Sequence, residues 1–157
     1  MNLPSPGKRT ARLPIFFFPL LYLAGAAGYY AMEVAFRGYS HWSMAVCGGL
    51  CLCLIFLANR CLFRLPLLFR ALVSALIITA VELAAGCLLN LLLGWHVWDY
   101  SSLPYNLWGQ IAPRFSALWF ALSIPVCMLC TLLDKTRRRG RTADKPKSRA
   151  PRQGNAT

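Results

Sequence analysis

The chain has 157 residues, 57% of them hydrophobic, and carries a formal net charge of +12. This composition is too apolar for an ordinary soluble domain, and no nucleic-acid recognition module accompanies the positive charge, so we expect no nucleic-acid partner. A helix that crosses a membrane needs roughly 20 mostly apolar residues. Four segments reach or approach this length, namely residues 15–36, 42–58, 67–93 and 115–133. They predict an all-α, polytopic membrane protein with about four transmembrane helices in a lipid bilayer.

The basic residues are distributed unevenly, and their distribution predicts the orientation of the chain. If the N-terminus is cytoplasmic, 15 of the 17 lysines and arginines lie on the cytoplasmic side, and only Arg37 and Arg114 lie outside. Positive residues favour the cytoplasmic face, so we expect both termini there. This topology divides the chain into a cytoplasmic segment 1–14, a four-helix domain 15–134 with an outer loop 94–114, and a cytoplasmic tail 135–157. The tail is rich in basic residues, proline and serine, which predicts disorder.

The first apolar segment follows Lys8, Arg9 and Arg12 and therefore resembles a secretory signal. It continues to Phe36, which is longer than a signal requires, so we expect it to be retained as a helix.

Glu33, near the outer end of this segment, admits two interpretations. Arg37 follows it at i+4, which is the spacing of an ion pair on a helix surface. Tyr22 and Tyr29 lie on roughly the same helix face as Glu33, so these side chains could instead line a cavity.

The third apolar segment carries the acidic residue Glu82 near its middle. An ionised carboxylate at this depth costs several kcal/mol unless it is paired or hydrated, so we expect Glu82 to face the protein interior. Gly86 and Asn90 follow at i+4 and i+8 and therefore share one helix face with it. Two roles stay open for Glu82: a protonated side chain that joins helices by hydrogen bonds, or a group that meets an ion, a proton or a substrate.

The outer loop is dense in aromatic and short polar side chains. Asp99 and Ser101 suit a turn in which the carboxylate accepts from the backbone, Pro104 stiffens the loop, and Gly109 lets the backbone turn. The loop is either a rigid plug at the membrane surface or a vestibule through which a substrate enters.

Signatures of an enzyme, a metal site or a disulfide framework are weak. The sequence has no nucleophile elbow, P-loop or HExxH motif, so we expect no enzyme, no cofactor and no metal. The seven cysteines lie in or beside apolar segments and are expected to pack as small hydrophobic residues. A weaker alternative is a metal site at the outer surface, made by Glu33, His41, His96 and Asp99.

Several motifs together carry a family resemblance. They are Val81-Glu82-Leu83-Ala84-Ala85-Gly86, Trp98-Asp99-Tyr100-Ser101, Pro104-Tyr105-Asn106, Gly109, Ile111 and Ser116, with the earlier stretch from Glu33 through Arg37 and His41 to Met44. The chain resembles the CmpB-type putative ABC-transporter (type IV) family of permease-like bacterial membrane proteins.

The resemblance implies a permease-like subunit in the bacterial inner membrane that works with an ATP-binding subunit. A closed pathway through about four helices would need a homodimer or another subunit. The residues expected to bind a substrate or partner are Glu33, Arg37, His41, Glu82, Gly86, Asn90, Trp98, Asp99, Tyr100, Ser101, Pro104, Asn106 and Gly109. The alternative is an accessory or sensory membrane protein whose aromatic outer loop binds an envelope component.

Overall fold

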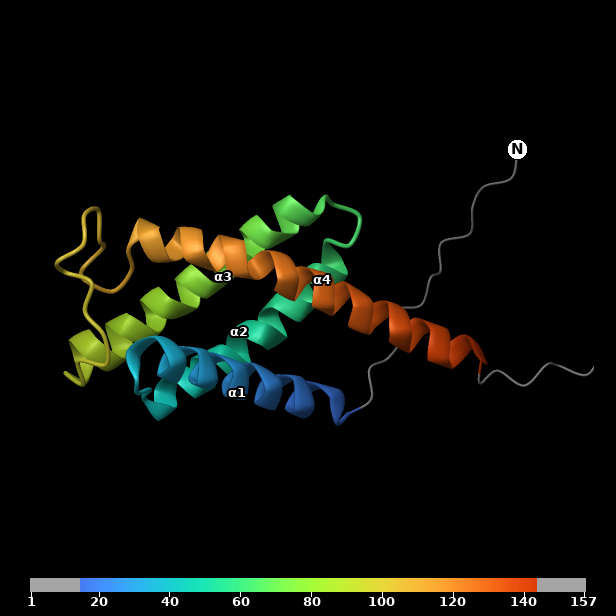
Figure 1. The fold of residues 1–157 in the computed structure, drawn as a ribbon, viewed down its shortest axis with the longest axis horizontal. Helices are drawn as coiled ribbons and strands as arrows, with labels where there is room; N and C mark the ends of the chain where they lie inside the picture. The colour runs from blue at the N-terminus through green and yellow to red at the C-terminus, as the bar shows by residue number, and fades with distance from the viewer. Residues whose placement is uncertain (1–14, 144–157) are drawn as a thin grey trace, which may run out of the picture.

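The computed structural model describes residues 15–143, and in this range the chain is built from helices. Only an isolated bridge between Leu107 and Ile111 resembles β-structure in these residues. A π-helical segment, η1, extends the third helix directly. The helices are α1 (Phe17–Arg37), α2 (Trp42–Cys61), α3 (Leu67–Gly86), η1 (Cys87–Leu92) and α4 (Pro113–Ala143), as Figure 1 shows. The predicted all-α fold is confirmed.

Three of these helical stretches are long and apolar enough to cross a membrane: Trp42–Cys61, Leu67–Leu92 and Pro113–Thr136. The shortest predicted segment, residues 42–58, is therefore among them, as part of Trp42–Cys61. α1 is outside this group because its 21 residues include tyrosines, glycines and Glu33, which lower its hydropathy. The crossing of the membrane by α1 stays a prediction, as do the cytoplasmic termini.

Some predicted boundaries are wrong by a few residues, and one by more. α2 continues past Ala58 to Cys61, and in this added turn the Asn59 side chain is buried and donates to the carbonyl of Ile55 at 3.1 Å. α4 continues to Ala143, so disorder is wrong for residues 135–143. Lysine and arginine are good helix formers and extend a helix that packing has already nucleated. Segment 1–14 and residues 144–157 lie outside the described range.

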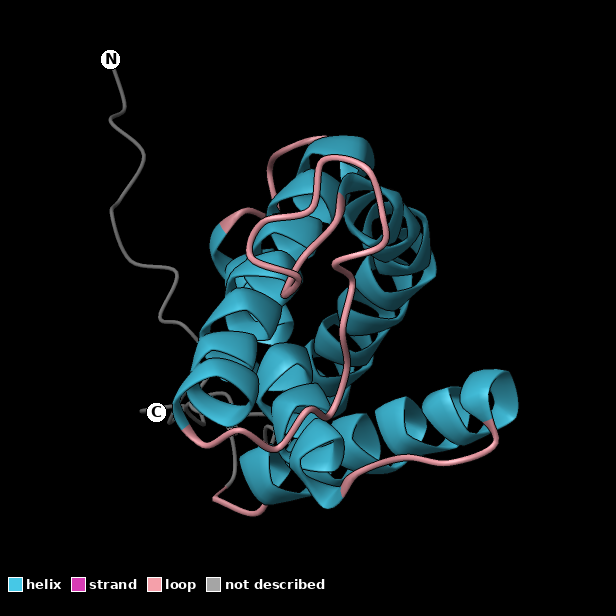
Figure 2. Cartoon of the chain, turned by 90° about the vertical axis from the view of Figure 1, so that its left-hand side faces the viewer, coloured by secondary structure: helices cyan, strands magenta, loops and turns pink. Residues whose placement is uncertain are grey.

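The helices form an open ring. α1 packs along α2, α3 packs along α4, and α2 joins the two pairs through contacts with α3 and α4 (Figures 1 and 2). Among the residues that the structure describes, no Cα atom of α1 lies within 8 Å of a Cα atom of α4. Around the ring, many leucines and phenylalanines are exposed, such as Leu20, Leu76 and Leu132, which suits helices whose outer faces meet lipid.

Two small apolar cores hold the ring together. One contains Phe17, Leu21, Ile55, Phe56 and Cys130 and ties α1 to α2 and α4. The other contains Met44, Leu89 and Trp98 and lies beneath the loop that joins η1 to α4. We call the end with this loop the outer end and the end with the α2–α3 turn the inner end, following the predicted orientation.

The α1–α2 contact depends on glycine. A Cβ atom on Gly25 would lie 2.6 Å from the carbonyl oxygen of Gly48, whereas one on Gly28 would meet nothing within 4 Å. We expect Gly25→Ala to destabilise the protein by about 1–3 kcal/mol, because overpacking forces the helices apart. The matched change Gly28→Ala should be neutral or slightly stabilising. Thermal unfolding of the purified protein in detergent measures both, and equal melting temperatures would show that the close helix approach is wrong.

Candidate functional site

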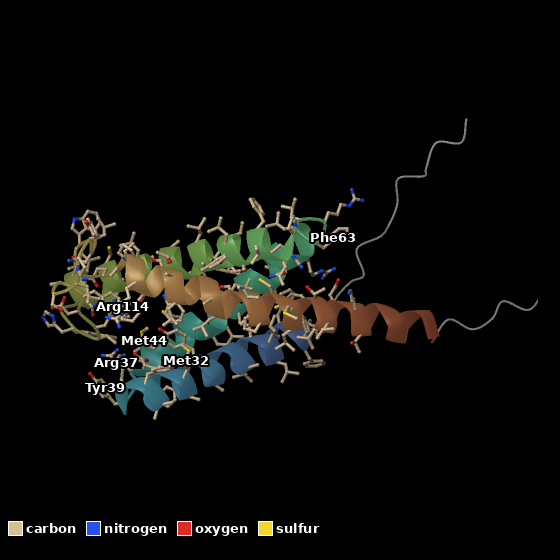
Figure 3. The ribbon with its side chains drawn as sticks, turned by 45° about the horizontal axis from the view of Figure 1, so that its top comes forward. Met32, Arg37, Tyr39, Met44, Phe63 and Arg114 are labelled. Atoms are coloured by element: carbon tan, nitrogen blue, oxygen red, sulfur yellow. The ribbon has the colours of Figure 1, made fainter. Side chains whose placement is uncertain are left out.

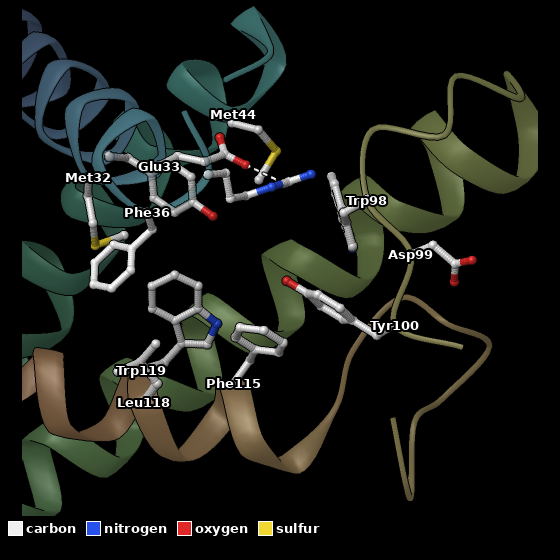
Figure 4. Close-up of a pocket in the computed structure, with 12 residues that line it drawn as sticks. Met32, Glu33, Phe36, Met44, Trp98, Asp99, Tyr100, Phe115, Leu118 and Trp119 are labelled. Carbon is white, nitrogen blue, oxygen red and sulfur yellow. Dashed lines mark hydrogen bonds and ion pairs between the residues drawn. The ribbon is translucent and has the colours of Figure 1, made fainter. Parts of the chain in front are cut away.

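A cavity of about 430 Å³ opens in the outer half of the bundle, between α1, α4 and the outer loop. This volume is within the range of small-molecule sites. Figure 4 shows the residues around it, which are Tyr29, Met32, Glu33, Phe36, Arg37, Met44, Trp98, Asp99, Tyr100, Phe115, Leu118 and Trp119. The gap between the backbones of α1 and α4 is thus closed only by side chains.

Aromatic rings make most of the cavity wall. Tyr100 and Phe115 stack with their centroids 4.4 Å apart, so the loop rests on the start of α4. Tyr29 and Trp119 meet at 5.8 Å, so side chains of α1 and α4 touch although their backbones do not. A ligand in the cavity would therefore face ring faces and edges from three elements.

Glu82 lies directly behind this aromatic wall and is 6% exposed. The hydroxyl of Tyr100 donates to Oε1 at 3.1 Å, and Nε1 of Trp119 donates to Oε2 at 3.0 Å. Both donors are neutral, and the described residues place no cation in an ion pair with Glu82. Glu82 lines a small void that shares Tyr29, Met44, Trp98 and Trp119 with the main cavity. The carboxyl group is therefore one side-chain layer away from the open space.

Glu33 is also buried, and it fits both interpretations of the sequence. Its Oε1 pairs with Nη1 of Arg37 at 2.7 Å, and its Oε2 accepts from the Ser40 hydroxyl at 2.5 Å. Glu33 and Arg37 both line the cavity as well. Arg37 continues to the outer loop, where its Nη2 donates to the carbonyl of Val97 at 3.2 Å. The ion pair thus neutralises the charge of Arg37 at the cavity mouth.

Asp99 sits on the rim in the predicted turn. The Ser101 hydroxyl and the Ser101 backbone N–H, the latter at 2.8 Å, donate to Oδ1 and lower the pKa of the Asp99 carboxyl. Figure 4 shows the carboxylate directed away from Trp98 and Tyr100. For Tyr100, burial and then the nearby Glu82 raise the pKa above its ordinary value. Asp99 thus stays charged at the rim, and Tyr100 stays a hydrogen-bond donor.

Asn90 fastens the outer loop to the third helix. Its Nδ2 donates to the carbonyl of Trp98 at 2.9 Å and to Oε1 of Gln110 at 2.8 Å, and its Oδ1 accepts from the backbone N–H of Val97 at 2.7 Å. Nε1 of Trp98 donates in turn to the carbonyl of Gln110 at 3.0 Å. Asn90 lies in the π-helical η1, a type of segment common at functional sites.

Gly86 makes room for the same fastening. A Cβ atom there would lie 2.5 Å from Oε1 of Gln110. The structure therefore has the predicted helix face with Glu82, Gly86 and Asn90. On this face, Gly86 and Asn90 hold the outer loop in place. Neither Gly86 nor Asn90 is among the residues that line the cavity, and their expected role in binding a substrate or partner stays a prediction.

The remaining loop residues form a rigid platform. Nδ2 of Asn106 donates to the carbonyl of Leu103 at 2.8 Å, and its Oδ1 accepts from the Gly109 N–H at 2.9 Å. Gly109 has a φ of 71°, which glycine adopts without strain. Ser101 closes the Asp99 turn, and Pro104 is exposed at the tip. These residues position the rim of the cavity.

His41 caps the start of α2 and does not line the cavity. Its Nδ1 accepts from the backbone N–H of Ser43 at 3.3 Å and so caps α2, and its ring contacts Trp42 and Trp95. In residues 15–143 there is no group of three or more His, Cys, Asp or Glu side chains that could hold a metal ion. Tyr29 was predicted to line a cavity in only one of two interpretations, and Phe115, Trp119 and Gln110 were not among the predicted site residues. Trp119 had a signal, because it stands well inside an apolar segment rather than at a membrane boundary.

Apolar helices long enough to cross a membrane, with a cavity between them, define the class of helical membrane proteins. A family profile described as "Putative ABC-transporter type IV" matches residues 23–139, which include every residue of the cavity. The chain therefore belongs to this family and is a membrane protein related to transport. No curated protein and no solved structure matches it.

The fastening of the loop by Asn90 can be tested directly. Asn90→Leu removes three hydrogen bonds and leaves buried partners unsatisfied, so we expect a loss of about 2 kcal/mol or more and faster amide exchange in residues 95–111. Tyr105→Ser is the control, because this side chain is 90% exposed at the loop surface. Hydrogen–deuterium exchange measures both variants, and unchanged protection in Asn90→Leu would contradict the fastening.

Proposed function

We propose that this chain is a permease-like subunit of an ABC-type transport system in the bacterial inner membrane, and that its outer cavity binds a small organic cation. The observation that carries the proposal is the aromatic cavity backed by Glu82, a buried carboxyl group with neutral partners only. In this function the cavity residues bind and position a solute without breaking any of its bonds.

The charge and chemistry of the wall support a cation. Arg37 is neutralised by Glu33, so the acids left without a basic partner in the described residues are Glu82 behind the wall and Asp99 at the rim. Faces of tyrosine and tryptophan attract ammonium groups, most strongly where water is excluded. A cation with an apolar body would thus gain from the rings and from Glu82 behind them, and Asp99 adds negative charge at the rim.

The open side of the ring suggests how the pathway is completed. α1 and α4 enclose the cavity by side chains alone, so one copy offers no continuous helical wall there. We propose that a second copy or another membrane subunit covers this side during transport.

At the inner end, the α2–α3 turn is the proposed contact for an ATP-binding subunit. Arg64 is exposed there, with its guanidinium 5.5 Å from the ring centroid of Phe63. Arg60 and Arg70 point into the protein, where they meet Asp134 and Thr131 respectively. Arg64 is therefore the arginine of this turn that is best placed to meet a partner.

Binding of a cation can be measured with choline as the probe and its neutral isostere 3,3-dimethylbutan-1-ol as the control ligand. We expect choline alone to raise the melting temperature and to change tryptophan fluorescence. Glu82→Gln should weaken choline binding about tenfold, because it removes the buried charge and leaves Trp119 facing an amide. Trp119→Phe should weaken it less.

The control variant is Ser123→Ala, in the same helix as Trp119 but outside the cavity, and it should bind choline as the wild type does. All variants are compared at equal amounts in the membrane. Equal responses to choline and to its isostere, or full binding by Glu82→Gln, would contradict the cation site.

Partnership with an ATP-binding subunit is tested by mass spectrometry of proteins that co-purify from the native membrane in mild detergent. We expect a stoichiometric ATP-binding protein, and its loss in Arg64→Glu through charge reversal at the turn. Arg114→Glu, at the opposite end of the bundle (Figure 3), should retain it. Recovery without any ATP-binding protein would contradict the permease role.

A second candidate function rests on one observation at the outer surface. Tyr105 is 90% exposed and Trp108 67% exposed on a loop whose backbone is otherwise held in place. In an accessory or sensory protein these rings would bind an envelope partner. Co-purification of an envelope protein that is lost in Tyr105→Ser, without an ATP-binding subunit, would favour this alternative.

A further inference from the structure

A second cavity, of about 360 Å³, lies at the inner end of the bundle and plays no part in the proposed function. It is bounded by the end of α2, the start of α3 and the last apolar turns of α4. Its lining residues are Asn59, Arg60, Phe63, Arg70, Cys130, Thr131, Asp134 and Lys135. Figure 3 shows Phe63 at the end of the molecule opposite Arg37 and Tyr39, so the two cavities belong to different ends.

The basic groups of this cavity outnumber the acidic ones. Arg60, Arg70 and Lys135 face a single acid, Asp134, which lies 3.7 Å from Nε of Arg60. Lys135 is exposed and has no hydrogen bond or ion pair with the residues that the structure describes. An anion would therefore balance the remaining positive charge.

Arg70 is fixed in place with part of its donor capacity unused. Its Nη1 donates to Oγ1 of Thr131 at 2.9 Å and to Oδ1 of Asn59 at 3.2 Å. Asn59 is itself anchored, because its Nδ2 donates to Sγ of Cys127 at 3.2 Å. Nε of Arg70 is buried and has no hydrogen-bond partner in the described chain. No hydrogen bond to the described residues uses Nη2, so this end of a preorganised guanidinium is the donor that can meet a phosphate oxygen.

The depth of the cavity indicates the source of that phosphate. The stretches able to cross a membrane end at Cys61, begin at Leu67 and end at Thr136, so the basic residues of the cavity lie within about one turn of these ends. This is the level of lipid headgroups. Beside the basic groups the cavity is lined by Phe63, whose side chain is 56% exposed and offers an apolar surface along which an acyl chain can lie.

The geometry points to a binding site for the phosphate group of an anionic phospholipid, held by Arg70 and Lys135 at the inner end of the bundle. Basic pockets between membrane helices are known to take lipid headgroups of this charge. The site is separate from the outer cavity, and it adjoins the α2–α3 turn proposed as the contact for an ATP-binding subunit.

The test is native mass spectrometry of the purified full chain in detergent, titrated with dioleoylphosphatidylglycerol and, separately, with dioleoylphosphatidylcholine. The two lipids share their acyl chains and phosphate but differ in net charge. We expect the wild type to retain phosphatidylglycerol in preference. Lys135→Gln should weaken this retention about fivefold and Arg70→Gln about tenfold or more.

Lys135→Gln keeps the test decisive if Arg70→Gln fails to fold, because Lys135 supports no other described side chain. Arg64→Gln is the matched control: it removes the same charge at the same end but lies outside the cavity, and it should retain the lipid as the wild type does. Equal retention of the two lipids, or equal loss in Arg64→Gln, would overturn the site. Displacement of the lipid by millimolar inorganic phosphate would assign the cavity to a free anion and overturn the lipid assignment.

Discussion

The burial of Glu82 is the constraint on which the outer half of the molecule depends. A carboxyl group inside a helical bundle is costly unless donors surround it, and here the donors come from two other elements, Tyr100 of the loop and Trp119 of α4. Each of these side chains also forms part of the cavity wall. The side chains that donate hydrogen bonds to Glu82 are therefore also the ones that shape the cavity. A substitution that removes one of these hydrogen bonds must also change the cavity wall.

The loop can serve this purpose because its backbone is fixed from below. Asn90 and Gln110 share a hydrogen bond beneath Trp98, and Gly86 leaves the space in which Gln110 lies. Polar groups buried together in this way stabilise a structure only when each has a partner, which makes the arrangement sensitive to single substitutions. These contacts thus fix the position of the aromatic loop relative to Glu82.

The two ends of the bundle differ in their chemistry. The outer cavity combines rings with acids, and the inner cavity combines arginine and lysine with a single acid. Side chains bridge α1 and α4 at both ends, through Tyr29 and Trp119 beside the outer cavity and through the core of Phe17, Phe56 and Cys130 at the inner end. Because no closer backbone contact joins α1 and α4, these side chains can move near the cavity without separation of the helices.

The sequence by itself determined the helical class, the approximate limits of the apolar segments and the burial of Glu82, because hydrophobic length and the cost of exposing a charge to lipid are local properties of the chain. It also indicated the Asp99 turn and the Glu33–Arg37 pair, which depend on residues two and four apart. Only the tertiary structure decided that Asn90 and Gly86 hold the loop, that Gln110 joins them, and that Trp119 and Tyr100 reach Glu82. These contacts link residues 7 to 37 positions apart. Their pairing depends on how the loop folds back and on which helix faces meet, and no spacing in the sequence encodes either.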